Sequence, residues 1–166
     1  MNVILSIKPK YAELILNGAK RYEFRKYIFK NKCVEHTYIY ATSPIKKIIG
    51  VFELGSIIRD SPEALWKQLG HLSGMNEAEF FLYFQDAQIG FAIEIKYIEI
   101  FNDPGDPEGL IPGFIPPQSF CYLKHSLFPE CAAKNHIESK SSTTGPTSHD
   151  SQPMEKSIRS DRPASR

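Results

Sequence analysis

Hydrophobic and polar residues alternate along several short stretches of the chain, a pattern typical of β-strands with one buried face. The alternation predicts strands over residues 3–7, around Tyr22, and over 36–42, 46–58 and 90–101. Apolar residues at helical spacing predict helices over residues 9–18, 62–69 and 76–84. Short, twisted strands lose their exposed edges when they close into a small barrel. We therefore predict an α+β fold, a mixed β-barrel of about five or six strands with two or three helices outside it.

Turn-forming residues separate these elements, and the composition changes near the C-terminus. Residues 26–32 form a basic loop that either contacts a phosphate or only connects two strands. Residues 102–117 are dense in Pro and Gly, which predicts a loop. After about residue 133, Ser, Thr, Pro and scattered charges replace the aliphatic residues, so too little apolar area remains to order the segment. We expect one domain over residues 1–133 and a disordered polar tail over 134–166.

The net charge of the 166 residues is only +1, but the charges are unevenly distributed. Residues 1–67 carry 12 Lys and Arg against 6 Asp and Glu, whereas residues 68–133 carry 2 against 9. A basic half beside an acidic half indicates a face that attracts an anion, for which nucleic acid and phosphate are the usual candidates.

Three features favour a soluble, cytoplasmic protein. No apolar run reaches the ~18 residues of a membrane span, and the first residues lack the pattern of a signal peptide. The three cysteines, Cys33, Cys121 and Cys131, fit no zinc-binding spacing, so we expect reduced and buried thiols. We accordingly expect no metal, no cofactor and no membrane partner.

Residues 20–26, which read Lys-Arg-Tyr-Glu-Phe-Arg-Lys, concentrate the candidate chemistry of the chain. In a strand, Glu23 and Arg25 share one face with Arg21, because successive side chains point to opposite sides. Same-face neighbours lie roughly 7 Å apart, so the acid and the arginine can hold each other as a fixed polar pair. The alternative is a solvated edge strand whose charges discourage aggregation.

Short motifs follow one another in the order of the predicted elements. They are Ser6-Ile7-Lys8-Pro9, Tyr11-Ala12, Ile15, Gly18, Lys20, Glu23 and Arg25, then Ile39-Tyr40-Ala41-Thr42-Ser43-Pro44 with Ile49-Gly50, and finally Pro116-Pro117-Gln118-Ser119-Phe120. Together they resemble the ASCH domain, a branch of the PUA-like superfamily, over about residues 3–125. The resemblance implies a PUA-like β-barrel with a cleft beside the first helix, into which Lys20, Glu23 and Arg25 point.

The resemblance also implies a class of functions. ASCH domains are generally RNA-binding or nucleobase-recognising modules, often in coactivators or regulators, so the implied partner is RNA or a modified nucleotide in a regulatory setting. Some members are enzymes. One group hydrolyses the amide of acetylated cytidine with a lysine, a threonine and a glutamate, and another is described as ribonucleases. Glu23 stands where the amide hydrolases have threonine, and Glu77 or Glu79 match their glutamate only by rough position.

We favour a binding module over an enzyme, with Lys20 as the catalytic residue if the protein turns over a substrate. Burial would lower the pKa of Lys20 and Glu23 would raise it, and this opposition favours a charged binding group over a general base. A further alternative is a protein-interaction module of a transcription-regulatory complex, with its contacts on the acidic segment 77–86.

We predict eight ligand-binding residues from their capacity for charge interactions, hydrogen bonding or stacking. They are Lys8, Lys20, Glu23, Arg25, Ser43, Gln118, Ser119 and Tyr122. The three cations would contact phosphate, and Glu23 would accept a hydrogen bond from an exocyclic amine such as that of cytosine. Ser43, Gln118 and Ser119 offer further polar contacts beside prolines that fix the backbone. Tyr40, Phe120 and Tyr122 are candidate stacking surfaces, with core packing as the alternative.

Overall fold

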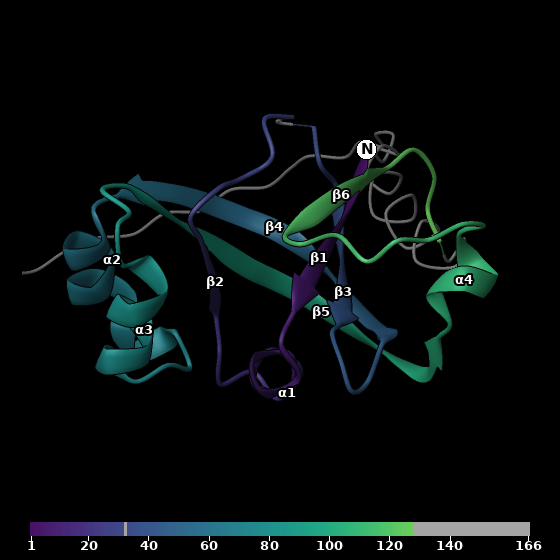
Figure 1. The fold of residues 1–166 in the computed structure, drawn as a ribbon, viewed down its shortest axis with the longest axis horizontal. Coiled ribbons are helices and arrows are strands. Elements are labelled where there is room, and N and C mark those ends of the chain that lie inside the picture. The colour runs from purple at the N-terminus through teal and green to yellow at the C-terminus, as the bar shows by residue number, and fades with distance from the viewer. Residues whose placement is uncertain (32, 128–166) are drawn as a thin grey trace, which may run out of the picture. The chain divides into compact units, whose positions relative to one another are not determined.

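A computed structural model describes residues 1–31 and 33–127, and Figure 1 shows how their helices and strands are arranged. The strands are β1 (Asn2–Ile7), β2 (Tyr22–Arg25), β3 (His36–Ala41), β4 (Lys47–Asp60), β5 (Gly90–Gly105) and β6 (Phe120–Leu123). The helices are α1 (Pro9–Leu16), α2 (Pro62–Leu69), α3 (Glu77–Phe84) and α4 (Pro107–Leu110), with a 3-10 turn over Gly70–Leu72. The predicted tail over 134–166 lies outside the described residues.

The six strands form one curled sheet, a half-barrel in the order β2-β5-β4-β3-β1-β6. β1 and β3 run parallel, whereas the other neighbouring strands are antiparallel. The long strands β4 and β5 pair with several register shifts, and such bulges bend and twist a strand pair. The sheet confirms the predicted α+β fold with six strands, and it leaves β2 and β6 at its two ends.

Alternating side chains of β1 reach two different hydrophobic clusters, so both faces of this strand are buried. Val3, Leu5 and Ile7 pack inside the curled sheet against α1. Ile4 points the other way and joins a cluster that Tyr38 shares with the segment around α4. The N-terminal strand is therefore fixed from both sides, which fixes the start of α1 beside it.

The helices α2 and α3 are inserted between β4 and β5 and lie together at one end of the sheet, with α4 at the other end (Figure 1). Ser61 and Asn76 cap α2 and α3 by accepting hydrogen bonds from backbone N–H groups of their first turns. Phe24 of β2 packs edge-to-face against Phe80 of α3, with ring centroids 5.1 Å apart. This contact holds α3 next to the charged stretch of β2.

Helix α1 ends where the sequence predicted an end. Asn17 follows its last residue, and Gly18 has a φ of 78°, a left-handed conformation that glycine adopts without a steric penalty. The next residues, Lys20 to Arg25, then run into β2. The Ser43-Pro44 turn between β3 and β4 was also predicted, and its peptide bond is cis.

The C-terminal part of the described chain differs from the prediction. The segment 102–117 was predicted to be a loop, but β5 continues to Gly105 and Asp106 then caps the single turn of α4. Strand β6 was not predicted and pairs antiparallel with β1. The thiols of Cys33 and Cys121 are free, but Cys33 is exposed and Cys121 is only half-buried, and Cys131 lies outside the described residues.

In residues 1–31 and 33–127, no helix combines the length and the apolar character that crossing a membrane requires.

Candidate functional site

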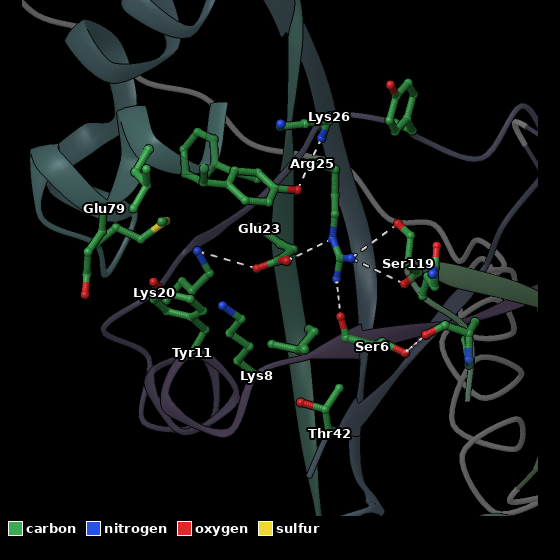
Figure 2. A pocket seen from close by; sticks show the side chains of 18 residues that line it. Ser6, Lys8, Tyr11, Lys20, Glu23, Arg25, Lys26, Thr42, Glu79 and Ser119 are labelled. Atoms are coloured by element: carbon green, nitrogen blue, oxygen red, sulfur yellow. Dashed lines mark hydrogen bonds and ion pairs between the residues drawn. The ribbon is translucent and has the colours of Figure 1, made fainter. Parts of the chain in front are cut away.

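A pocket of about 780 Å³ opens beside α1, β2 and α3, a size typical of small-molecule sites (Figure 2). Its cationic lining residues are Lys8, Lys20, Arg25 and Lys26, and its acidic ones are Glu23 and Glu79. Aromatic side chains from α1, β2, α3 and the loop after β2 complete much of the wall. They are Tyr11, Phe24, Tyr27 and Tyr83. The pocket thus combines positively charged groups with aromatic rings.

A row of three buried charges forms the floor of this pocket. The carboxylate of Glu23 lies between Lys20 and Arg25 (Figure 2), with Oε1 2.9 Å from Nε of Arg25 and Oε2 3.5 Å from Nζ of Lys20. The contact with Nε is an ion pair without a well-aligned hydrogen bond. The three residues are only 2% (Lys20), 7% (Glu23) and 7% (Arg25) exposed. β2 is an edge strand of the sheet, but these charges are withdrawn from water, so the alternative in which they are solvated is wrong.

The guanidinium of Arg25 connects β2 to the other end of the sheet. Its Nη2 donates to the carbonyl oxygen of Ser6 in β1 at 2.8 Å, and its Nη1 lies 3.3 Å from the carbonyl oxygen of Ser119. Ser6 in turn donates from its hydroxyl to the carbonyl oxygen of Pro117 at 2.6 Å. Side-chain hydrogen bonds thus join β2, β1 and the segment before β6 at one edge of the pocket.

The ammonium group of Lys20 is held from several directions. It donates to the carbonyl oxygen of Ser73 at 2.7 Å and lies 5.5 Å and 5.3 Å from the ring centres of Tyr11 and Phe24. Burial lowers the pKa of Lys20, and the neighbouring charge of Glu23 opposes this shift only in part. Of the two opposing effects expected from the sequence, burial is the larger.

The mouth of the pocket is framed by α1 and α3. Lys10 of α1 donates to Glu79 of α3 at 2.6 Å, which connects the two helices. Tyr83 accepts a hydrogen bond from the backbone of Lys26 at 3.3 Å, and burial raises the pKa of its phenol. Tyr27, at 77% exposure, presents its ring to solvent at the rim.

Most of the predicted ligand-binding residues come together at this pocket. Lys8, Lys20, Glu23, Arg25, Gln118 and Ser119 all line it. Ser43 and Tyr122 do not. Ser43 is exposed in the turn after Thr42, which lines the pocket in its place. The hydroxyl of Tyr122 accepts hydrogen bonds from the backbone of Lys30 and Asn31.

Of the other proposed stacking residues, Tyr40 and Phe120 lie away from the pocket. Tyr40 is 3% exposed and packs on Phe114, and Phe120 packs on Phe29. The rings that do line the pocket were not identified from the sequence, because Tyr83 belongs to the distant insertion and Tyr11 matched the core pattern of α1. Periodicity alone gives no signal that separates these two rings from core residues.

Within the described parts of the chain, no three His, Cys, Asp or Glu side chains are grouped as a metal ion would require. The absence of a metal and of a cofactor from the function therefore stays a prediction.

The chain is similar to known proteins over most of the described residues. The ASCH domain family model matches residues 5–101. An ASCH domain-containing ribonuclease of Zymomonas mobilis is 28% identical over 127 residues, which are 73% of this chain and 83% of that protein. The large ribosomal subunit protein uL22 of Ureaplasma parvum is 27% identical over 125 residues, which are 74% of this chain and 39% of that protein.

Solved structures give the same result for the fold. The crystal structure of ASCH from Zymomonas mobilis aligns with a TM-score of 0.72 and 25% identity, covering 79% of this chain and 93% of that one. The family match covers more than half of the chain, and the half-barrel agrees with it. This protein therefore belongs to the ASCH domain family.

Proposed function

We propose that this ASCH domain binds single-stranded RNA and seats one nucleotide in the pocket above Lys20, Glu23 and Arg25. The observation that carries the proposal is the row of buried charges at the base of an open pocket. Charged groups withdrawn from water in a cleft are typical of binding and catalytic sites, since burial costs free energy unless partners or a ligand offset it.

Residues at the rim of the pocket can contact the other two recognisable parts of a nucleotide, its phosphate and the flat face of its base. Lys8 is exposed and Lys26 half-buried, and both line the pocket, where they can contact backbone phosphates. Tyr27 and Tyr83 offer rings on which an unpaired base can stack, which is how single-stranded RNA is commonly held.

The test is a fluorescence anisotropy titration of the full chain with short single-stranded RNAs at several salt concentrations. Lys8→Ala should weaken binding to all sequences alike and should reduce the slope of log affinity against log salt by roughly one. Lys67→Ala is the matched control, because Lys67 is an exposed lysine of α2 that does not line the pocket. Equal effects of the two variants, or no binding of any RNA by the parent protein, would contradict the proposal.

Ribonuclease activity is a second candidate function, and two observations favour it. The relative from Zymomonas mobilis is named an ASCH domain-containing ribonuclease. In this chain, burial lowers the pKa of Lys20, which is the direction that favours a neutral amine able to accept the proton of a ribose hydroxyl.

Turnover separates the two candidates. The full chain is incubated with short RNAs and with modified nucleosides, acetylcytidine among them, and both the solution and the protein-bound fraction are examined by mass spectrometry. Cleaved RNA that disappears with Lys20→Met would support the ribonuclease. Intact RNA recovered with the protein would support the binding module, and loss of the acetyl group would indicate an amide hydrolase instead.

A further inference from the structure

The floor of the pocket presents hydrogen-bonding groups in a fixed order. Lys20 and Arg25 carry only donors, and the carboxylate of Glu23 between them carries only acceptors (Figure 2). The order across the floor is thus donor, acceptor, donor. Because all three side chains are nearly buried and hold one another, a ligand meets this order as a rigid pattern.

Each of the three groups has hydrogen-bonding capacity left for a ligand. Lys20 has three N–H donors, and its contacts with Ser73 and Glu23 occupy two directions. Arg25 has five N–H groups, more than its contacts with Glu23, Ser6 and Ser119 require. Each oxygen of Glu23 faces one cation and has a further lone pair.

We propose that this floor selects a base whose edge carries a ring N–H between two carbonyl oxygens, which is the edge of uracil. The inference rests on the proposed RNA-binding function and adds the identity of the base. The ring N–H would donate to Glu23, and the two carbonyl oxygens would accept from Lys20 and Arg25. All three groups of the floor then have a partner.

The other bases satisfy the floor less well. Cytosine presents an amino group, a ring nitrogen acceptor and a carbonyl. If its amino group is moved opposite Glu23, either Lys20 or Arg25 faces a C–H group. Adenine lacks both carbonyl oxygens. Guanine matches Lys20 and Glu23, but its amino group then stands opposite the donors of Arg25. A pocket of about 780 Å³ does not exclude purines by size, so the discrimination comes from the edge pattern.

The experiment compares short single-stranded RNAs of equal length and of one base each in binding to the full chain. An oligomer of 3-methyluridine is the decisive probe, because a methyl group replaces the hydrogen of the ring N–H while both carbonyl oxygens stay in place. We expect the uridine oligomer to bind about tenfold or more tightly than the cytidine, adenosine and 3-methyluridine oligomers, the discrimination typical of a good base contact.

Two variants test whether Glu23 causes the preference for uridine. Glu23→Gln replaces a pure acceptor by an amide that can also donate, so the preference for uridine over cytidine should shrink by about tenfold. Glu79→Gln makes the same chemical change at the mouth of the same pocket, and it should alter the affinity for all oligomers without altering their order. Thermal unfolding of each variant verifies that it is folded. If Glu23→Gln does not fold, the methylated oligomer still decides the question.

The outcomes separate the inference from the proposed function. If no RNA binds, the proposed function and the base preference both fail. If RNA binds but the uridine and 3-methyluridine oligomers bind alike, or another base is preferred, the selection of uracil is wrong while RNA binding stands.

Discussion

Glu23 is the shared counter-ion of two buried cations, Lys20 and Arg25. A buried charge that loses its partner is strongly destabilising, since water cannot replace the lost interaction. Glu23 therefore stabilises the fold as well as shaping the floor of the pocket.

We predict that Glu23→Ala lowers the free energy of unfolding by about 3–5 kcal/mol, because two cations then remain buried without a counter-ion. Urea denaturation followed by circular dichroism measures this difference. Glu13→Ala on the exposed side of α1 is the matched control, for which we expect a change within about 0.5 kcal/mol. Similar losses in both variants would contradict the role of Glu23 as a buried counter-ion.

Lys20 should give the stability of the protein a distinctive dependence on pH. Burial lowers its pKa below the ordinary value of 10.5 in the folded state. Between the folded pKa and 10.5, the unfolded chain binds more protons than the folded chain, so the free energy of unfolding rises with pH in this interval. We predict that the parent protein gains stability relative to Lys20→Met as the pH rises through it. Denaturant unfolding of both proteins over a pH series measures the difference, and a flat or falling difference would contradict the prediction.

Strand alternation was enough to predict that Glu23 and Arg25 share a face, whereas the place of Lys20 beside them followed only from the resemblance to the ASCH domain. Alternation could not predict the backbone partners of this row, Ser73 and Ser119, because they come from segments far along the chain. Alternation also could not predict that Thr42 rather than Ser43 lines the pocket, since a turn can present either of two neighbouring hydroxyls. At the residue scale, the sequence therefore predicts contacts between near neighbours in the chain, whereas contacts with distant segments depend on the tertiary fold.

At the scale of elements, the close approach of β4 and β5 depends on Gly50. A Cβ atom at this position would lie 2.8 Å from the backbone oxygen of Glu99, which is closer than real side chains approach. We predict that Gly50→Ala lowers the free energy of unfolding by about 1–3 kcal/mol, the usual cost of overpacking.

The chain offers a matched control for this substitution. Gly109 lies in α4, and the nearest atom to an added Cβ is 3.9 Å away. Gly109→Ala should be neutral or stabilise by about 0.5–1 kcal/mol, because alanine restricts the unfolded chain more than glycine does. Guanidinium denaturation of both variants provides the comparison, and a fully stable Gly50→Ala protein would show that β4 can move away from β5.

The ion pair between Lys10 and Glu79 connects α1 with α3 at the mouth of the pocket. Its hydrogen bond raises the pKa of Lys10 and lowers that of Glu79. Given the proposed function, Glu79→Gln should strengthen RNA binding, because it removes a negative charge from the pocket and frees Lys10 for a phosphate. Glu77→Gln in the same helix is the control and should have a smaller effect, since Glu77 does not line the pocket. Anisotropy titrations at low salt measure both, and weaker binding by Glu79→Gln would contradict the prediction.

The elements that the sequence missed share a physical cause. Strand β6 has only four residues, and its pairing with β1 joins segments more than a hundred residues apart. Helix α4 is a single turn whose Asp-Pro-Glu-Gly sequence also matches an ordinary turn. By contrast, α1 was predicted with its end because Gly18 is a local signal. Elements with a local sequence signal could be predicted, whereas elements without such a signal form only through contacts between distant segments.

For the domain as a whole, the uneven charge of the sequence has a structural counterpart. The cations of the pocket come from the basic N-terminal half, and Glu79 comes from the acidic insertion. The two halves of the sequence therefore meet across the pocket rather than forming separate faces.

We predict that residues 1–133 fold without the remainder of the chain. The reason lies in the sequence, since residues 134–166 contain few apolar side chains that could contribute to a core. Differential scanning calorimetry of the full chain and of a variant ending at residue 133 should give midpoints within about 2 °C of each other. A drop of many degrees would show that the domain needs its C-terminal segment.

Arg25 links the two ends of a sheet that backbone hydrogen bonds leave open, since β2 and β6 are its terminal strands. The pocket lies beside these contacts between β2 and the other end of the sheet. Given the proposed function, a ligand that contacts Arg25 and Gln118 would touch both β2 and the segment before β6, and its binding would stabilise the contact between these two edges of the sheet. Hydrogen exchange of the backbone amides in β2 and β6, at opposite ends of the sheet, should then slow in both strands when the pocket is occupied. Ligand binding would thus stabilise both ends of the sheet at once.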